Sequence, residues 1–303
     1  MGARVRPLPA PLAPGARLGV MAPAGPTDPD RLAAGVAALR RAGYEVIVAA
    51  NATARGGHLA GGDRERLAGI VTLLDEEVDA LIASRGGYGT MRLLPELPWD
   101  RLAAWQGWVV GFSDLTALHA ALATRFPRAT LHGPMVASLA GDARSVERLL
   151  AWLQGRGPRQ LFDLGRARVL RPGVARGVAV GGTLSILAAL AGTPFEPEYE
   201  GAVLFLEDVG EPLYRLDRLL TQLRLSSKLS LVQAVVVGHL ARCGRGEARW
   251  RERFRELLLQ AVPAEAVVVE GVSFGHGRAN MPFPLGIAVE VDTGRGTISR
   301  GGG

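Results

Sequence analysis

Cysteine and lysine are almost absent from this chain of 303 residues. Cys243 is the only cysteine, so the chain cannot form a disulfide within itself, which suits a reducing cytosol. Lys228 is the only lysine, and the net charge of +6 therefore comes almost wholly from arginine. The arginines are spread among acidic residues, and neither a basic stripe nor a nucleic-acid-binding module appears, which argues against nucleic acid as a partner. A modest positive field of this kind favours a small anionic substrate.

Uninterrupted apolar runs of membrane-spanning length are also missing. One charge-free stretch, Gly177–Phe195, comes close, but it contains Gly181-Gly182 and Pro194, so we expect a buried strand, a turn and a helix there. The N-terminus has early arginines and several prolines but no apolar core of signal-peptide length. We therefore expect a soluble, cytoplasmic protein that does not associate with membranes.

What the chain does have is enough apolar sequence for a large core. Hydrophobic residues make up 48% of the chain and charged residues 21%, which is typical of a globular protein. In the first half, short apolar runs alternate with helical patterns, which predicts a parallel sheet with helices on its faces, of the flavodoxin/Rossmann type. We expect the strands of this sheet near residues 18–22, 44–50, 79–84, 108–111 and 130–132.

The second half mixes strands and helices less regularly, so the fold class we predict is α/β with two domains. We expect a flexible N-terminal arm over residues 1–16 and the N-terminal α/β domain over residues 17–154. A linker rich in glycine, proline and arginine follows over residues 155–172. A smaller C-terminal domain, α+β or barrel-like, then covers residues 173–303.

The stretch with the strongest chemical character is W-V-V-G-F-S-D-L-T, Trp108–Thr116. A buried strand, a sharp turn and a helix start are the parts of a nucleophile elbow, which exposes a serine hydroxyl. The usual pattern is G-x-S-x-G, and here Leu115 occupies the place of the second glycine. The alternative is that Ser113 only caps the helix that follows, because serine is a favoured N-cap residue.

A serine nucleophile needs a base, and five histidines are available. His276 lies between two glycines shortly after a buried strand, in a setting that leaves an imidazole accessible. His132 and His239 end short strands and could also reach a cleft, whereas His58 lies in a polar loop and His119 inside the helix after Ser113. Position alone does not choose among them.

The chemistry also needs a carboxylate to orient the base and N–H donors for the oxyanion. Glu207 follows a strand of five apolar residues and is therefore the best candidate for the acid, with Asp208 and Glu211 as near alternatives. The glycine-rich loop Arg85–Thr90 follows a predicted strand, as Ser113 does, and ligands of parallel sheets bind beyond such strand ends. The expected oxyanion donors are backbone N–H groups, namely those of Gly86, Gly87 and Asp114.

Together these motifs resemble the LD-carboxypeptidase family of serine peptidases, whose sibling branch is the immunity peptidase that disarms microcin C. The motifs are, in chain order, R-G-G-Y-G, G-F-S-D, L-H-G-P-M, G-G-T-L, L-E-D-V-G-E and F-G-H, and the resemblance runs from about Leu18 to Ile298. It implies that Ser113 is the nucleophile, on the first domain, and that Glu207 and His276 on the second domain are the orienting acid and the base. Thr183 stands where the family more often has asparagine, which leaves a supporting hydrogen bond in question.

The resemblance implies a carboxypeptidase that releases the terminal D-alanine of murein tetrapeptides in cell-wall recycling, with no metal or cofactor. The alternative within the fold is a microcin-C-type peptidase acting on aminoacyl-nucleotide analogues, which would need an aromatic shelf that is not evident between Glu207 and His276. An alternative of a different functional class is a module that binds a small peptide without catalysis. Candidates for contacting the peptide and its terminal carboxylate are Arg85, Tyr88 and Arg278. The sequence is compatible with a homodimer.

Overall fold

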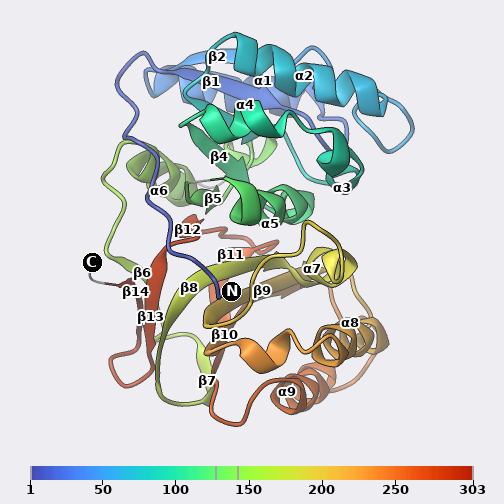
Figure 1. The fold of residues 1–303 in the computed structure, drawn as a ribbon, viewed down its shortest axis with the longest axis vertical. Coiled ribbons are helices and arrows are strands. Elements are labelled where there is room, and N and C mark those ends of the chain that lie inside the picture. The colour runs from blue at the N-terminus through green and yellow to red at the C-terminus, as the bar shows by residue number, and fades with distance from the viewer. Residues whose placement is uncertain (1, 127, 142, 302–303) are drawn as a thin grey trace. The chain divides into compact units, whose positions relative to one another are not determined.

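The structure is a computed structural model that describes residues 2–126, 128–141 and 143–301. It contains two compact units, each with its own sheet (Figure 1). The N-terminal unit comprises Leu8–Pro158 and Met281–Phe283. The C-terminal unit comprises Met1–Pro7, Arg159–Asn280 and Pro284–Gly303. Both units combine helices with a sheet, so the predicted α/β class with two domains is confirmed.

The sheet of the N-terminal unit contains the five strands that the sequence predicts. They are β1 (Arg17–Met21), β2 (Glu45–Val48), β3 (Ala80–Ala83), β4 (Trp108–Gly111) and β5 (Thr130–His132). All pair in parallel, in the order β2-β1-β3-β4-β5, which is the flavodoxin order. The direction of the strand order reverses between β1 and β3, so the loops after these strands flank the place where such sheets bind ligands.

A sixth strand, β12 (Phe283–Leu285), lies beside β5 although it comes about 150 residues later in the chain. The carbonyl of Pro282 accepts a hydrogen bond from the indole of Trp152 at 3.1 Å, which helps to fix this return to the N-terminal unit. The sequence predicts that residues 173–303 belong to the C-terminal domain, and the position of β12 in the first sheet departs from that prediction.

Helices of the N-terminal unit follow the strands as the alternating pattern predicts (Figure 1). Asp28 caps the first of them, since its carboxylate accepts from the backbone N–H groups of Asp30 and Arg31, both at 3.1 Å. The α-helices are α1 (Pro29–Arg41), α2 (Asp63–Asp75), α3 (Thr90–Leu93), α4 (Trp99–Ala104), α5 (Thr116–Arg125) and α6 (Ala143–Leu153). Short 3₁₀ turns are η1 (Leu94–Glu96), η2 (Ser113–Leu115) and η3 (Val136–Ser138).

The C-terminal unit contains the larger sheet, with eight strands in the order β6-β14-β13-β8-β9-β10-β11-β7. Its central strands β8 to β11 pair in parallel, whereas β13, β14 and β6 on one side and β7 on the other pair antiparallel. The strands are β6 (Gln160–Asp163), β7 (Arg168–Arg171), β8 (Val174–Thr183), β9 (Ala202–Val209), β10 (Ala234–Ala241), β11 (Val267–Gly275), β13 (Ala288–Asp292) and β14 (Thr297–Arg300).

Three helices cover one face of this sheet (Figure 1). They are α7 (Leu184–Leu190), α8 (Leu213–Leu225) and α9 (Trp250–Ala261), with the 3₁₀ turn η4 (Leu229–Leu231) after α8. Leu216, Leu220 and Leu258 from the helices pack with Leu204 and Val235 from the strands in one buried cluster. Burial of each such side chain stabilises the fold by about 1.5–3 kcal/mol.

Two segments are more ordered than the sequence suggested. Residues 155–172, expected as a linker, contain β6 and β7, which pair with β14 and β11, segments about a hundred or more residues later in the chain. The N-terminal residues, expected as a flexible arm, are held by backbone hydrogen bonds from Ala3 to Glu200 (2.9 Å) and from Leu12 to Leu153 (2.7 Å). In the part of the chain that the structure describes, no helix is long and apolar enough to span a membrane.

Candidate active site

Ser113 follows β4 in a sharp turn with a left-handed backbone. Its φ is +63°, a conformation that costs a non-glycine residue energy and is frequent at functional sites. The N-cap positions of η2 and α5 are Phe112 and Leu115, so Ser113 is not a helix cap and the capping interpretation is wrong. The local geometry matches the nucleophile elbow that the motif predicts.

The departure of this turn from G-x-S-x-G has a packing explanation. Leu115 is fully buried, and a Cβ added at Gly111 would lie 2.8 Å from the Leu115 Cγ. Gly111 therefore provides the space that the leucine side chain fills, and the turn closes with only one glycine.

The glycine-rich loop after β3 lies directly against the serine. A Cβ added at Gly86 would lie 2.9 Å from both the Cβ and the Oγ of Ser113, so only glycine fits there without a shift. Gly87 has φ +129°, a conformation that also favours glycine. The side chain of Asp114 is buried, and its carboxylate accepts from the Thr90 backbone N–H at 2.8 Å. The serine turn and the loop at 85–90 are thus tied together by a charge-assisted hydrogen bond.

A buried arginine, which the sequence analysis did not single out, braces the same loop. The side chain of Arg66 on α2 is fully buried, and its guanidinium donates to the carbonyls of Pro23 and Gly89, the latter at 2.9 Å. It also pairs with Asp63, whose pKa is lowered by its hydrogen bond to Arg92 and by Arg66. The signal in the sequence was periodicity, since Arg66 precedes the buried Ile70 by one helical turn.

Arg85 and Tyr88, the predicted substrate contacts on this loop, are both exposed. The Arg85 guanidinium donates to the carbonyls of Gly86 at 3.0 Å and Pro26 at 3.2 Å, so it supports the loop backbone as it stands. Tyr88 is 50% exposed, and its ring centroid lies 5.4 Å from that of His58. A contact with substrate stays a prediction for both residues.

In the C-terminal unit, Glu207 and His276 are hydrogen-bonded partners. Glu207, at the end of β9, is fully buried, and its Oε2 accepts from the His276 Nδ1 at 2.6 Å and from the His276 backbone N–H at 3.2 Å. Its Oε1 accepts from the Thr183 hydroxyl at 2.6 Å. Threonine at position 183 therefore does supply a hydrogen bond that the sequence analysis left in question. Because Nδ1 donates to Glu207, the Nε2 of a neutral His276 is left as the acceptor, which is the tautomer a general base requires.

The loop that carries His276 depends on glycine and on a buried amide. Gly275 has φ +89°, and a Cβ at this position would lie 2.5 Å from the Glu207 carboxylate. The Gly275 N–H donates to the side-chain oxygen of Asn280 at 2.8 Å, which closes the loop behind the histidine. Arg278 lies in the same loop, is exposed, and makes no hydrogen bond or ion pair with the residues that the structure describes.

Of the three candidate carboxylates, only Glu207 contacts a histidine among the described residues. Asp208 points to the start of α7, where its carboxylate accepts from the backbone N–H of Ser185 at 2.8 Å, and it also accepts from the backbone N–H of the adjacent Val209 at 2.7 Å. Burial raises the pKa of Asp208 to about 6. Glu211 forms an ion pair with Arg215 at 2.8 Å.

The other histidines have structural settings. His119 is buried and bridges the Gly111 carbonyl and the Thr130 hydroxyl, both at 2.9 Å, and burial lowers its pKa to about 4. His132, expected as a possible cleft residue, is fully buried, with its ring 5.0 Å from that of Phe283. His239 contacts the Ala279 carbonyl through Nε2 at 3.1 Å. None of these imidazoles is presented as His276 is.

These groups supply the parts of nucleophilic acyl chemistry. One unit offers a serine on a strained turn beside a loop that glycine allows to approach closely, and the other offers a histidine oriented by a buried carboxylate. No group of three or more histidine, cysteine, aspartate or glutamate side chains that could hold a metal ion occurs in the described part of the chain.

Comparison with known proteins places these motifs in one family. The model of the LD-carboxypeptidase N-terminal domain matches residues 18–133, and that of the LD-carboxypeptidase C-terminal domain matches residues 176–291. A putative carboxypeptidase of Streptomyces coelicolor is 42% identical over 300 residues, covering 96% of this chain and 95% of the relative.

Solved structures show the same fold. The muramoyltetrapeptide carboxypeptidase from Oxalobacter formigenes is 30% identical, with a TM-score of 0.79 over 92% of this chain and 97% of that one. The microcin C7 self-immunity protein MccF, solved in complex with glutamyl sulfamoyl guanosine, has a TM-score of 0.87 at 23% identity and covers 98% of each chain.

Proposed function

The chain belongs to the LD-carboxypeptidase family of serine peptidases, and on that premise we propose that it hydrolyses the L,D-peptide bond that holds the terminal D-alanine of murein tetrapeptides. The observation that carries the proposal is the hydrogen bond of 2.6 Å between Glu207 and His276, together with the strained turn at Ser113. A relative named muramoyltetrapeptide carboxypeptidase supports the choice of substrate.

In the mechanism we propose, Ser113, His276 and Glu207 act as one triad. His276 Nε2 takes the hydroxyl proton while the Ser113 Oγ attacks the carbonyl carbon of the scissile bond, and the buried Glu207 carboxylate stabilises the imidazolium. The N–H groups of Gly86, Gly87 and Asp114 receive the oxyanion. His276 then gives its proton to the nitrogen of D-alanine, which leaves, and a water molecule activated by His276 hydrolyses the acyl-enzyme.

A carboxypeptidase must also recognise the free carboxylate of the residue that it releases. Burying that charge without a partner is costly, so a cation or several N–H donors should meet it. We propose Arg278 in preference to Arg85, because the guanidinium of Arg85 already donates to two loop carbonyls, whereas Arg278 is exposed and makes no such contact with the described residues. Tyr88, exposed on the glycine-rich loop, is our candidate for a contact with the peptide stem.

The decisive experiment is hydrolysis of purified tetrapeptide and pentapeptide stems, with product masses read by mass spectrometry. We expect release of D-alanine from the tetrapeptide only, and a loss on the order of 10⁴-fold or more in both Ser113→Ala and His276→Ala, because members of a triad act as a unit. His132→Ala serves as the matched control and should keep activity if it remains folded. Turnover by folded Ser113→Ala would overturn the assignment of the nucleophile.

The same assay distinguishes the proposed carboxypeptidase activity from a microcin-C-type activity, which is the alternative within the fold. A glutamyl sulfamoyl nucleoside offered in place of the peptide should be a poor substrate, because the likeness to MccF is a likeness of fold at 23% identity. Efficient cleavage of that compound with no release of D-alanine from the tetrapeptide would favour the microcin-type activity instead.

A further inference from the structure

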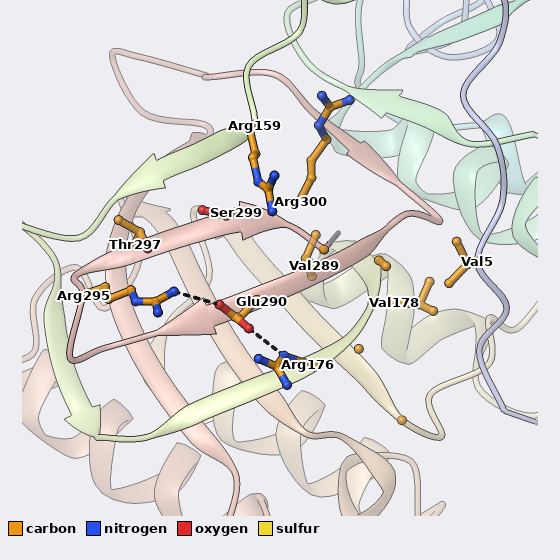
Figure 2. A pocket seen from close by; sticks show the side chains of 14 residues that line it. Val5, Arg159, Arg176, Val178, Val289, Glu290, Arg295, Thr297, Ser299 and Arg300 are labelled. Carbon is orange, nitrogen blue, oxygen red and sulfur yellow. Dashed lines mark hydrogen bonds and ion pairs between the residues drawn. The ribbon is translucent and has the colours of Figure 1, made fainter. Parts of the chain in front are cut away.

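The antiparallel half of the C-terminal sheet carries a groove that the proposed peptidase activity does not use. It has a volume of about 780 Å³ and lies over β14, β13 and β8, within the range of roughly 300–1,000 Å³ that is usual for ligand sites (Figure 2). Arg176, which lines it, is on β8 seven residues before Thr183, the partner of Glu207. Seven residues of strand span about 23 Å, so the groove and the Glu207–His276 pair lie at opposite ends of β8.

Four arginine side chains originate from four different segments along this groove, against a single carboxylate. They belong to Arg159 before β6, Arg176 on β8, Arg295 in the β13–β14 turn and Arg300 at the end of β14, and the carboxylate is that of Glu290. Arg300 is on the opposite face of β14 from Ser299, so the charged side chains that face the groove are those of Arg159, Arg176, Arg295 and Glu290, and positive charge is in excess.

The single carboxylate is shared. Glu290 pairs with Arg176 at 2.6 Å and with Arg295 at 3.8 Å, as Figure 2 shows by dashed lines, and Arg295 also lies 3.4 Å from Asp292. The side chains of Arg176 and Arg295 are 78% and 77% exposed, so these ion pairs are weak and can be exchanged for contacts to a ligand. The guanidinium of Arg159 makes no hydrogen bond or ion pair with the residues that the structure describes.

Hydroxyl donors lie between the charged groups. The register of the sheet places Ser299, Glu290 and Arg176 in one row across β14, β13 and β8, and Thr297 points to the same face as Ser299 because strand side chains alternate. Neither hydroxyl is hydrogen-bonded to any residue in the described ranges. The backbone hydrogen bond of 2.8 Å from Arg300 to Arg159 sets these two residues beside each other at one end of the groove (Figure 2).

We propose that this groove binds a small ligand through a diphosphate group. Guanidinium groups bind phosphate oxygens in a bidentate manner, and a diphosphate carries enough negative charge to offset the excess of arginine. From β6 to β8 the sheet spans about 14 Å, so arginines at the two ends can contact two linked phosphates with Ser299 between them. No aromatic side chain lines the groove among the described residues, so the diphosphate is recognised and a nucleobase is not.

The test is calorimetric titration of the full-length protein with pyrophosphate, with ADP as a second source of the same group. We expect saturable binding of both with similar affinity, weakened by added salt. Arg159→Ala/Arg176→Ala should weaken it by about tenfold or more, because two charge-assisted contacts are lost. Arg249→Ala/Arg253→Ala is the matched control, because it removes two exposed, ion-paired arginines of the same unit outside the groove and should leave binding unchanged.

A second variant tests the direction of the electrostatic argument. Glu290→Gln removes the carboxylate that competes with the ligand for Arg176 and Arg295, so it should tighten pyrophosphate binding by about threefold or more. The proposal is overturned if pyrophosphate does not bind saturably, if both arginine pairs have equal effects, or if Glu290→Gln weakens binding. Much tighter binding of a DNA duplex, lost in Arg159→Ala/Arg176→Ala, would make the groove a nucleic-acid surface and would also overturn it. Binding should be unchanged in Ser113→Ala, so the result is independent of the proposed hydrolysis.

Discussion

Replacing Gly86 with alanine tests whether the glycine-rich loop acts on the serine. The substitution adds one methyl group, whose carbon would lie 2.9 Å from both the Cβ and the Oγ of Ser113 and 3.4 Å from the Met135 Cε. The backbone of Gly86 does not have a left-handed φ, so alanine is allowed there and no backbone strain is added. Any effect must therefore come from the contact with the serine turn.

The expected loss of activity follows from the steric overlap between the added methyl group and Ser113. Carbon atoms in contact prefer a separation of about 3.5–4.0 Å, so Ser113 or the loop must move by roughly 0.6–1 Å. A displacement of about 1 Å in a reacting group can cost roughly 10²-fold in rate. Overpacking of this kind lowers the free energy of unfolding by about 1–3 kcal/mol, which a domain stable by about 5–15 kcal/mol survives. We therefore expect Gly86→Ala to be folded and to lose about 10²-fold in kcat.

Two measurements check this expectation. The first is the rate of D-alanine release, and the second is the rate at which a fluorophosphonate labels Ser113, which needs no peptide substrate. Gly56→Ala is the control in the same unit, because a Cβ at Gly56 has its nearest neighbour, the Gly61 carbonyl carbon, at 3.4 Å. A folded Gly86→Ala enzyme that labels at the rate of the native protein would refute the reasoning, and so would an equal loss in Gly56→Ala.

Three further predictions concern buried polar groups. Thr183→Val should lower kcat by roughly tenfold, because it removes the hydrogen bond of 2.6 Å to Glu207, and Thr183→Ser should restore most of it in the same assay. The pKa of Asp208 is raised by burial to about 6 from 3.8, so the folded state binds its proton more tightly than the unfolded state. In urea titrations, the free energy of unfolding of the native protein relative to Asp208→Asn should therefore fall by about 2–3 kcal/mol between pH 4 and pH 7, and a difference that does not change with pH would contradict this. The pKa of His119 is lowered by burial to about 4 from 6.5, so its pH dependence has the opposite sign. The free energy of unfolding of the native protein relative to His119→Gln should fall by about 3 kcal/mol as the pH falls from 6.5 to 4, and a difference independent of pH would show that His119 is not buried in its neutral form.

The sequence predicted the first sheet well because its signals are local. Each strand is an apolar run next to a helical pattern, and β1 to β5 all appear within a few residues of their predicted positions. The second sheet was predicted less well because its edge strands are short and pair with distant segments. Arg168–Arg171 lies in a segment rich in glycine, proline and arginine that predicts a linker. It nevertheless forms β7, because it pairs with β11 about a hundred residues later in the chain.

The candidate site could be predicted in part for a related reason. Strand ends and the family's motifs already favour Ser113, Glu207 and His276 in the sequence, with Asp208 as a near alternative to Glu207, and the hydrogen bond between His276 and Glu207 supports that choice. Adjacent residues of a strand point to opposite faces, so the two carboxylates must have different partners, but the sequence does not say which face holds the histidine. The contacts decide it, with Glu207 on His276 and Asp208 on the start of α7.

Buried charged side chains are not predicted by the composition or the motifs, and they have a similar structural role in both units. Arg66 donates to the carbonyls of two loops, and Asp114 accepts from the first N–H of α3. In the other unit, Asp208 accepts from N–H groups of Ser185 and Val209, and Glu207 from the N–H of His276. A buried charge is expensive unless it is fully hydrogen-bonded, and here the partners are mainly backbone groups in loops and at the ends of helices and strands. The energy that Arg66, Asp114 and Glu207 cost is therefore coupled to the positions of the loops that carry the serine, the glycine-rich turn and the histidine, and that of Asp208 to the start of α7. For that reason, removing any one of them should disturb the geometry of a loop before it unfolds a core.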